Sequence, residues 1–169
     1  MVVRNNYHWI QNLDNISFIA NGDIMRLIRI RKHTERYGFR FAEADLCLPD
    51  YAHHEFRAII MLDALRSEAA SITEEQNQRL FNEVAEDYAH ITSKAQQYKT
   101  MKEDPFFNAL QVKFAYSVTC HKAQGGQWEC IFLDQGRINE EKMNLEYLRW
   151  LYTAITRATK KLYLVNFTG

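Results

Sequence analysis

The sequence has few glycines, prolines and cysteines, and it has no long apolar run. Its 169 residues include six glycines, two prolines and three cysteines. Cys47, Cys120 and Cys130 form no C-x-x-C pair, which argues against a zinc site and predicts reduced core thiols in a reducing compartment such as the cytoplasm. No apolar run approaches ~18 residues, and Arg-Asn-Asn at residues 4–6 stands where a signal peptide needs its apolar stretch, so we expect no membrane span and no leader.

The chain also lacks an excess of either charge. Lys+Arg and Asp+Glu number 21 each, while 47% of the residues are hydrophobic and 13% aromatic. This balance excludes a protein that holds nucleic acid by a bulk positive field, but it allows a narrow groove lined by a few cations. The apolar content predicts a packed protein with one domain, or one lobe with an insertion.

The first clear pattern is a β hairpin. Ile28–Arg31 and Phe39–Phe41 alternate with period two on either side of Tyr37-Gly38, a turn signal. Between Ile24 and Arg40 the chain has six Arg or Lys and one acid, Glu35. Such a hairpin suits a nucleic-acid backbone, although the solvated face of an exposed sheet explains the same charges.

A helical segment follows. Phe56–Leu62 fits either a further strand or a buried helix. Thr73 is expected to cap a helix whose apolar positions recur at helical spacing from Leu80 to Ile91, and we expect this amphipathic segment to reach about Lys102. Asp104-Pro105 then marks the return to the main sheet.

The segment that carries the chemistry begins near residue 112. Val112–Val118 is apolar and predicts a buried strand, and Cys130–Leu133 predicts a second one. Between them a polar string contains Gly125 and Gly126, which allow a tight turn or a close ligand approach. Ligands of open α/β sheets bind outside the carboxyl ends of strands, so this turn is a candidate ligand site. An ordinary polar connection between two strands remains the alternative.

The last elements are a helix and a strand. Asn144–Ala158 has an apolar stripe, while Arg157 lies about 180–240° around the helical wheel from that stripe. The geometry therefore directs Arg157 away from the core, and Leu162–Phe167 predicts the final strand. A surface cation or a structural ion pair is the alternative role for this arginine.

Two of these strings resemble helicase motifs. T-x-H-K-A-Q-G at residues 119–125 is similar to motif V of superfamily 1 DNA helicases of the RecD/Pif1-like branch. Y-T-A-x-T-R-A at residues 152–158 is similar to motif VI, within what is known as the UvrD-like helicase C-terminal domain, and RNNY and NGD near the start are weaker likenesses. The resemblance implies an α/β fold: a partial RecA-like (P-loop NTPase type) parallel sheet lobe formed by residues 1–23 and 105–169. It further implies that residues 24–104 are an insertion, an SH3-like β-rich unit followed by the helical segment.

The resemblance also implies roles for residues that match the motifs. The catalytic residue is Arg157, an arginine finger that reaches the γ-phosphate of ATP. The ATP contacts are Gln124, Gly125, Gln127 and Arg157, with Gln127 standing where many relatives have Glu. The DNA contacts are Thr119, His121 and Lys122, although a buried structural role fits His121 equally well. Trp128 and Trp150 suit base stacking or, preferably, core packing.

The implied activity needs a second lobe. The sequence has no G-x-x-x-x-G-K-[ST] loop, so the ligands of Mg²⁺ and most phosphate contacts belong on an N-terminal RecA-like lobe. The resemblance implies ATP-dependent 5′→3′ translocation on single-stranded DNA, in repair or recombination, and no ATP turnover by these 169 residues alone. The alternatives are the helicase subunit of an exodeoxyribonuclease V-like complex, with exonuclease subunits as partners, and a noncatalytic DNA- or protein-binding module.

Overall fold

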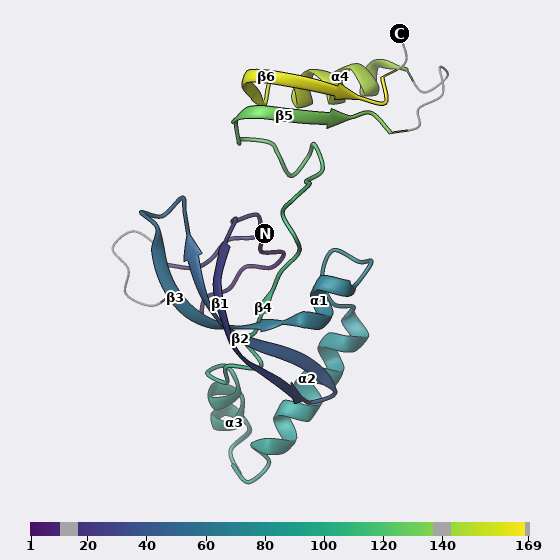
Figure 1. Ribbon diagram of the computed structural model, residues 1–169. Coiled ribbons are helices and arrows are strands. Elements are labelled where there is room, and N and C mark those ends of the chain that lie inside the picture. Colours follow the sequence, from purple (N-terminus) through teal and green to yellow (C-terminus); the bar gives the residue numbers. More distant parts are fainter. Residues whose placement is uncertain (11–16, 137–142, 168–169) are drawn as a thin grey trace. The chain divides into compact units, whose positions relative to one another are not determined.

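The computed structural model describes residues 1–10, 17–136 and 143–167 (Figure 1). It is a mixed α/β structure that contains parallel strands. The chain divides into two compact units, Met1–Ala115 and Tyr116–Gly169. The division into a lobe of residues 1–23 and 105–169 with an insertion at 24–104 stays a prediction.

The first unit contains a four-stranded sheet with the order β1-β2-β3-β4. The strands are β1 (Arg26–Arg36), β2 (Phe39–Leu48), β3 (His54–Met61) and β4 (Leu110–Gln111). The first three pair antiparallel, and β4 pairs parallel with β3. The predicted hairpin is confirmed: Tyr37 and Gly38 both have positive φ, 55° and 69°, as a two-residue turn between twisted strands requires. The ambiguous segment at 56–62 is a strand, and the short helix α1 (Leu62–Arg66) follows it.

Strands β2 and β3 are covered on both faces, whereas β1 is exposed along most of its length. Phe39, Phe41 and Met61 pack with residues of the helical segment on one face. Leu46 and Ile60 pack on the other face against the N-terminal segment, in a cluster that also contains Val2, Ile10 and Ile19. The alternation of strand side chains thus supplies two cores to a single sheet.

The helical segment consists of two helices, so the prediction of one continuous helix to about Lys102 is wrong. They are α2 (Glu74–Asp87) and α3 (Lys94–Met101). Thr73 caps α2 through a complete capping box with Gln76, as the sequence predicts. The chain leaves the helical conformation at Tyr88, and the Ser93 side chain accepts a hydrogen bond from the Gln96 amide to begin α3. Each of the two helices therefore has its own side-chain N-cap.

The predicted strand at Val112–Val118 is not present. The parallel pairing of β3 with β4 stops at Gln111, and Val112 makes only an isolated bridge with Val2. Residues 113–118 join neither sheet, and the Tyr116 side chain is 94% exposed. Apolar composition alone therefore did not make a strand, because a strand also needs a neighbour to pair with.

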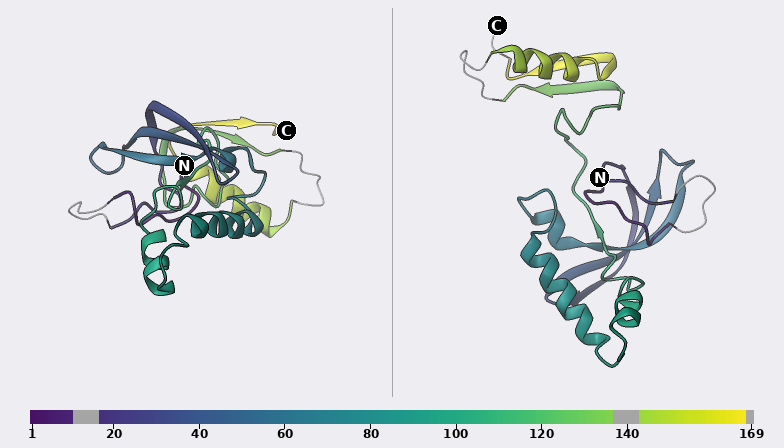
Figure 2. Two further views of the ribbon diagram at one scale, coloured as in Figure 1. Left: turned by 90° about the horizontal axis from the view of Figure 1, so that it is seen from below. Right: turned by 180° about the vertical axis from the view of Figure 1, so that it is seen from behind.

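The second unit is a single β-α-β element (Figures 1 and 2). It contains β5 (Trp128–Asp134), α4 (Leu145–Ile155) and β6 (Ala158–Val165), with β5 and β6 parallel. Asn144 caps α4 by accepting hydrogen bonds from the amides of Glu146 and Tyr147. The helix ends three residues earlier than predicted, and the last strand starts four residues earlier.

Much of the apolar surface of the second unit is open. In the α4 stripe Leu145, Leu148 and Tyr152 are 61%, 56% and 68% exposed. Phe132 on β5 stacks on Tyr163 of β6, with ring centroids 4.8 Å apart, and is 71% exposed. Cys130 lies on this open face of β5, so the prediction that all three thiols are core residues holds for Cys47 and is wrong for Cys130. Within the described ranges, no helix has both the length and the apolarity to cross a bilayer.

Candidate functional site

The residues that match motifs V and VI meet at one end of the β5–β6 pair. The motif V residues form the turn before β5, and Arg157 lies between α4 and β6. The Trp128 amide donates to the Arg157 carbonyl at 2.9 Å, which joins the two motifs through the main chain. The site therefore lies at the amino ends of β5 and β6. The expected position beyond the carboxyl end of a strand at Val112–Val118 is wrong, because that strand is not formed.

The motif V turn is closed mainly by its own backbone. The Ala123 amide donates to the carbonyls of Thr119 and Cys120, and the Gly126 amide donates to the Ala123 carbonyl. Among the described residues the Thr119 hydroxyl makes no hydrogen bond, so main-chain bonds close this part of the turn. The turn leaves its polar side chains exposed to solvent.

The two glycines of the turn are needed for different reasons. Gly125 has φ +84°, a backbone conformation that L side chains rarely adopt, and a Cβ added there would meet nothing within 4 Å. At Gly126 a Cβ would lie 2.5 Å from the Trp128 ring. One glycine provides the turn, and the other makes room for the indole.

Arg157 is held over this turn by three hydrogen bonds. Its Nη1 donates to the Gly126 carbonyl at 3.1 Å, across 31 residues of sequence. Its Nε donates to the Thr153 carbonyl at 3.0 Å, and its Nη2 donates to the Thr156 hydroxyl at 3.0 Å. The residue lies in the turn between the end of α4 and the start of β6. It is half-buried, so its expected position as an exposed residue of the helix face is wrong.

The Arg157 guanidinium makes no ion pair with any carboxylate of the described chain. All three of its acceptors are neutral, which contradicts the alternative of a structural ion pair within that part of the protein. Three of its five N–H groups are used, so two remain for another acceptor. Burial raises the pKa of the nearby Cys120 thiol, while the Arg157 charge acts to lower it.

The structure places the other candidates on the outside of the same turn. His121, Lys122, Gln124 and Gln127 are exposed, and the alternative of a buried structural histidine is therefore wrong. The structure brings Arg157 together with the Gly125-Gly126 turn, but it shows no side-chain contact from Arg157 to these four residues. Trp128 is 37% exposed, so it is only partly a packing residue.

Three contributors were not identified from the sequence. They are the Gly126 carbonyl, the Thr153 carbonyl and the Thr156 hydroxyl, all of which orient Arg157. Both threonines belong to the Y-T-A-x-T-R-A string, so the signal was present but their roles were not assigned. The Thr156 hydroxyl also donates to the Tyr152 carbonyl at 2.9 Å, which secures the last turn of α4.

The described chain offers no obvious metal centre. Among its His, Cys, Asp and Glu side chains, none gather in threes or more at a position that could hold an ion. What the second unit presents is a positioned, unpaired cation beside a glycine turn, with exposed amide and cationic side chains around it. This arrangement suits an anionic ligand rather than a metal.

A comparison with known protein families finds a match in this part of the chain. Residues 114–165 match the model of the UvrD-like helicase C-terminal domain. A comparison with curated proteins finds no match to this chain. The matched residues include both motif strings and cover β5, α4 and β6, so the match supports a helicase C-terminal domain in this segment and, with it, a helicase role.

Proposed function

We propose that residues 116–169 belong to the second motor lobe of an ATP-dependent DNA helicase, and that Arg157 acts on the γ-phosphate of ATP bound to an N-terminal RecA-like lobe. The observation that carries the proposal is the Arg157 guanidinium. It is held by three neutral acceptors, has no ion pair among the described residues and lies in a segment that matches the helicase family.

Charge develops on the transferring phosphoryl group during hydrolysis, and an arginine finger stabilises it. The bonds to Gly126, Thr153 and Thr156 would orient the guanidinium before the lobes approach each other, which lowers the cost of reorganisation. Bound ATP with Mg²⁺ would supply the scissile phosphate, and the Mg²⁺ ligands would come from the N-terminal lobe.

The exposed residues of the turn divide by chemistry. Gln124 and Gln127 can donate and accept hydrogen bonds, and Gly125 allows close backbone approach, so we assign these three to ATP. Thr119, His121 and Lys122 suit phosphate oxygens and are assigned to single-stranded DNA. By likeness to the RecD/Pif1 branch, movement would be 5′→3′.

The test uses the protein that contains both lobes. Arg157→Ala should lower DNA-stimulated ATPase activity about 10³- to 10⁵-fold, and Arg157→Lys should not restore it because lysine lacks the planar fork. DNA affinity should stay near normal. Arg149→Ala is the matched control, because Arg149 is an exposed arginine of α4, the helix that precedes Arg157, and its side chain makes no ion pair within the described residues.

Arg157→Ala should also reduce stability by about 1 kcal/mol, because the bonds to Gly126 and Thr153 are lost from a half-buried site. This cost exceeds the roughly 0.5 kcal/mol expected for a fully exposed position. Near-normal ATPase activity in Arg157→Ala would remove the finger assignment. Loss of both turnover and DNA affinity, with a collapsed melting transition, would assign the arginine to structure instead.

Two other activities remain open to the same site. A noncatalytic module would bind DNA or a protein partner, but the two-lobed wild-type protein would show no ATPase activity. The helicase subunit of an exodeoxyribonuclease V-like complex would copurify with exonuclease subunits, so purification of the two-lobed protein from its native source separates that alternative.

A further inference from the structure

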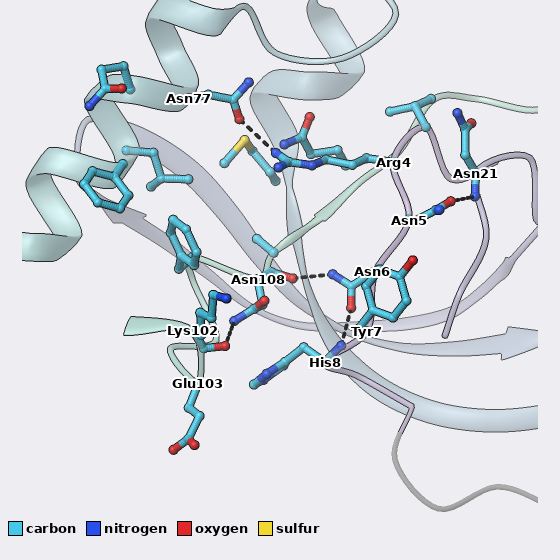
Figure 3. A pocket seen from close by; sticks show the side chains of 18 of the residues that line it. Arg4, Asn5, Asn6, Tyr7, His8, Asn21, Asn77, Lys102, Glu103 and Asn108 are labelled. Carbon is cyan, nitrogen blue, oxygen red and sulfur yellow. Dashed lines mark hydrogen bonds between the residues drawn. The ribbon is translucent and has the colours of Figure 1, made fainter. Parts of the chain in front are cut away.

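The first unit contains a pocket that the proposed helicase site does not use (Figure 3). Its volume is about 990 Å³, and all its lining residues lie between Val3 and Gln111. The walls come from the N-terminal segment, α2, α3 and the chain that leads into β4. It is therefore a separate site from the Arg157 turn, and it contains the RNNY string for which the sequence offered only a weak likeness.

One wall is a network of asparagine side chains that bond to the main chain. The Asn6 amide donates to the Asn108 carbonyl at 2.8 Å, and its oxygen accepts from the amides of His8 and Trp9. The Asn108 amide in turn donates to the Lys102 carbonyl at 2.7 Å. Both amide nitrogens are committed to main-chain carbonyls, so they hold the N-terminal segment against the chain after α3 and make this wall a fixed surface.

Two cations border the pocket without a carboxylate partner. Arg4 donates to the Asn77 side-chain oxygen at 3.0 Å, which orients its guanidinium (Figure 3). The Lys102 ammonium lies 4.6 Å from the centre of the Tyr98 ring. Neither cation makes an ion pair within the described residues, although Glu74 and Glu103 also line the pocket. The two cations are thus available to an anion, and the nearby acids keep the local field modest.

The pocket also has an aromatic platform. The Tyr7 ring stacks on Phe18, with centroids 4.9 Å apart and an interplanar angle of 29°. Tyr7 is nevertheless 64% exposed and lines the pocket. A flat ring that is backed on one face and open on the other is suited to stack with a planar ligand.

We propose that this pocket binds one nucleotide of unpaired nucleic acid, with the two phosphates that flank it in the strand at Arg4 and Lys102 and its base on Tyr7. The cations and the open ring that line this pocket match the two parts of a nucleotide, a phosphate and a flat base. The volume lies at the upper end of small-ligand sites, which leaves room for the sugar and for the chain to enter and leave. A free nucleotide has the same chemistry, so the experiment separates the two sources.

The experiment uses the 169-residue chain and fluorescence anisotropy of labelled 15-nucleotide dT and dA strands. Arg4→Gln with Lys102→Gln should weaken binding at least about 10-fold and lower the salt slope by about 1.4, near 0.7 for each lost phosphate contact on a single strand. Arg66→Gln with Lys99→Gln removes two exposed cations outside the pocket and should leave both quantities unchanged.

The ring is tested separately. Tyr7→Leu should weaken binding about 10-fold while circular dichroism stays unchanged, and a strand carrying 5-bromo-dU should crosslink to the peptide that contains Tyr7. Titration with dAMP distinguishes the sources, since the proposal requires that dAMP displace the strand only at far higher concentration than an unlabelled strand does.

Equal loss in the pocket and control variants, or crosslinks confined to residues 119–128, would overturn the proposal. Displacement by dAMP at concentrations equal to those of the strand would assign the pocket to a free nucleotide. Because Arg157→Ala leaves this pocket intact, unchanged anisotropy in that variant supports a site that is independent of the proposed motor function.

Discussion

Gly126 connects two features of the candidate site at the scale of single residues. Its carbonyl accepts the bond from Arg157, and its missing side chain leaves space for the Trp128 ring. Trp128 in turn donates its amide to the Arg157 carbonyl. The three residues therefore depend on one another, and a methyl group at position 126 affects all of them.

Gly126→Ala should destabilise the second unit by roughly 1 kcal/mol, the low end of the cost of overpacking, because the Trp128 ring is 37% exposed and can move partly away. A Cβ 2.5 Å from the indole forces either the ring or the turn to move. Hydrogen exchange at the Trp128 amide measures the effect, since that N–H bonds to Arg157, and its protection should fall.

The double variant Gly126→Ala/Trp128→Leu is the control, because the smaller side chain removes the clash. Protection at position 128 should return in this variant. If protection at position 128 stays at the wild-type level in Gly126→Ala alone, the close packing of glycine and indole has no structural role.

At the scale of elements, Asp63 joins α1 to β2. Its carboxylate accepts the Arg40 backbone amide at 2.6 Å and the Arg40 guanidinium at 2.8 Å. Partial burial alone raises the pKa of Asp63, but these bonds from Arg40 outweigh it and hold the pKa below the ordinary value of 3.8. Similar hydrogen bonds lower the pKa of Asp45 and of Asp87.

A lowered carboxylate pKa has a definite consequence for stability. The contribution is fully present above the unfolded value of 3.8 and is lost as the pH falls through the lower folded pKa. Asp63→Asn should therefore cost about 1 kcal/mol near neutral pH, after allowance for its exposure, and should flatten the loss of stability below pH 3.8. Urea unfolding of the chain at a series of pH values measures both effects.

Arg40→Ala provides the comparison for Asp63, because it removes the guanidinium bond and keeps the backbone bond. Its effect on the pH dependence should be intermediate between wild type and Asp63→Asn. An Asp63→Asn protein with the wild-type pH profile would show that the hydrogen bonds between Asp63 and Arg40 make no net contribution to the stability of the first unit.

At the scale of the whole molecule, the buried side chains are distributed unequally. Both large hydrophobic clusters lie within Met1–Ala115. Among the described residues of the second unit, the buried side chains are Ala123, Leu133, Gln135 and Ala154. The first unit therefore has a core of its own, whereas the second leaves one face of its sheet and the α4 stripe open.

A protein of residues 1–115 should fold alone and unfold cooperatively in urea, since both large hydrophobic clusters lie within this segment. Residues 116–169 alone should show no cooperative transition, because two strands and one helix bury too little apolar surface. Circular dichroism during urea titration of each fragment measures this. A sharp transition for 116–169, or its absence for 1–115, would contradict the distribution of stability described above.

Local chemistry in the sequence determined several parts of this protein. The turn at Tyr37-Gly38 and the Thr73 cap depend on residues that are neighbours in the chain, so spacing alone predicted them. The two motif strings indicated the helicase C-terminal domain that the comparison supports over residues 114–165. Those strings also placed Arg157 and the glycine turn in one candidate site.

Only the tertiary structure decided what depends on distant partners. It left residues 113–118 outside both sheets, exposed Cys130, and tied Arg157 to a carbonyl 31 positions away. It also assembled a pocket from segments as distant as Arg4 and Asn77. Apolar periodicity indicates which side chains are buried in an element. It does not indicate which other element buries them, because strand pairing and burial are contacts between segments far apart in the chain.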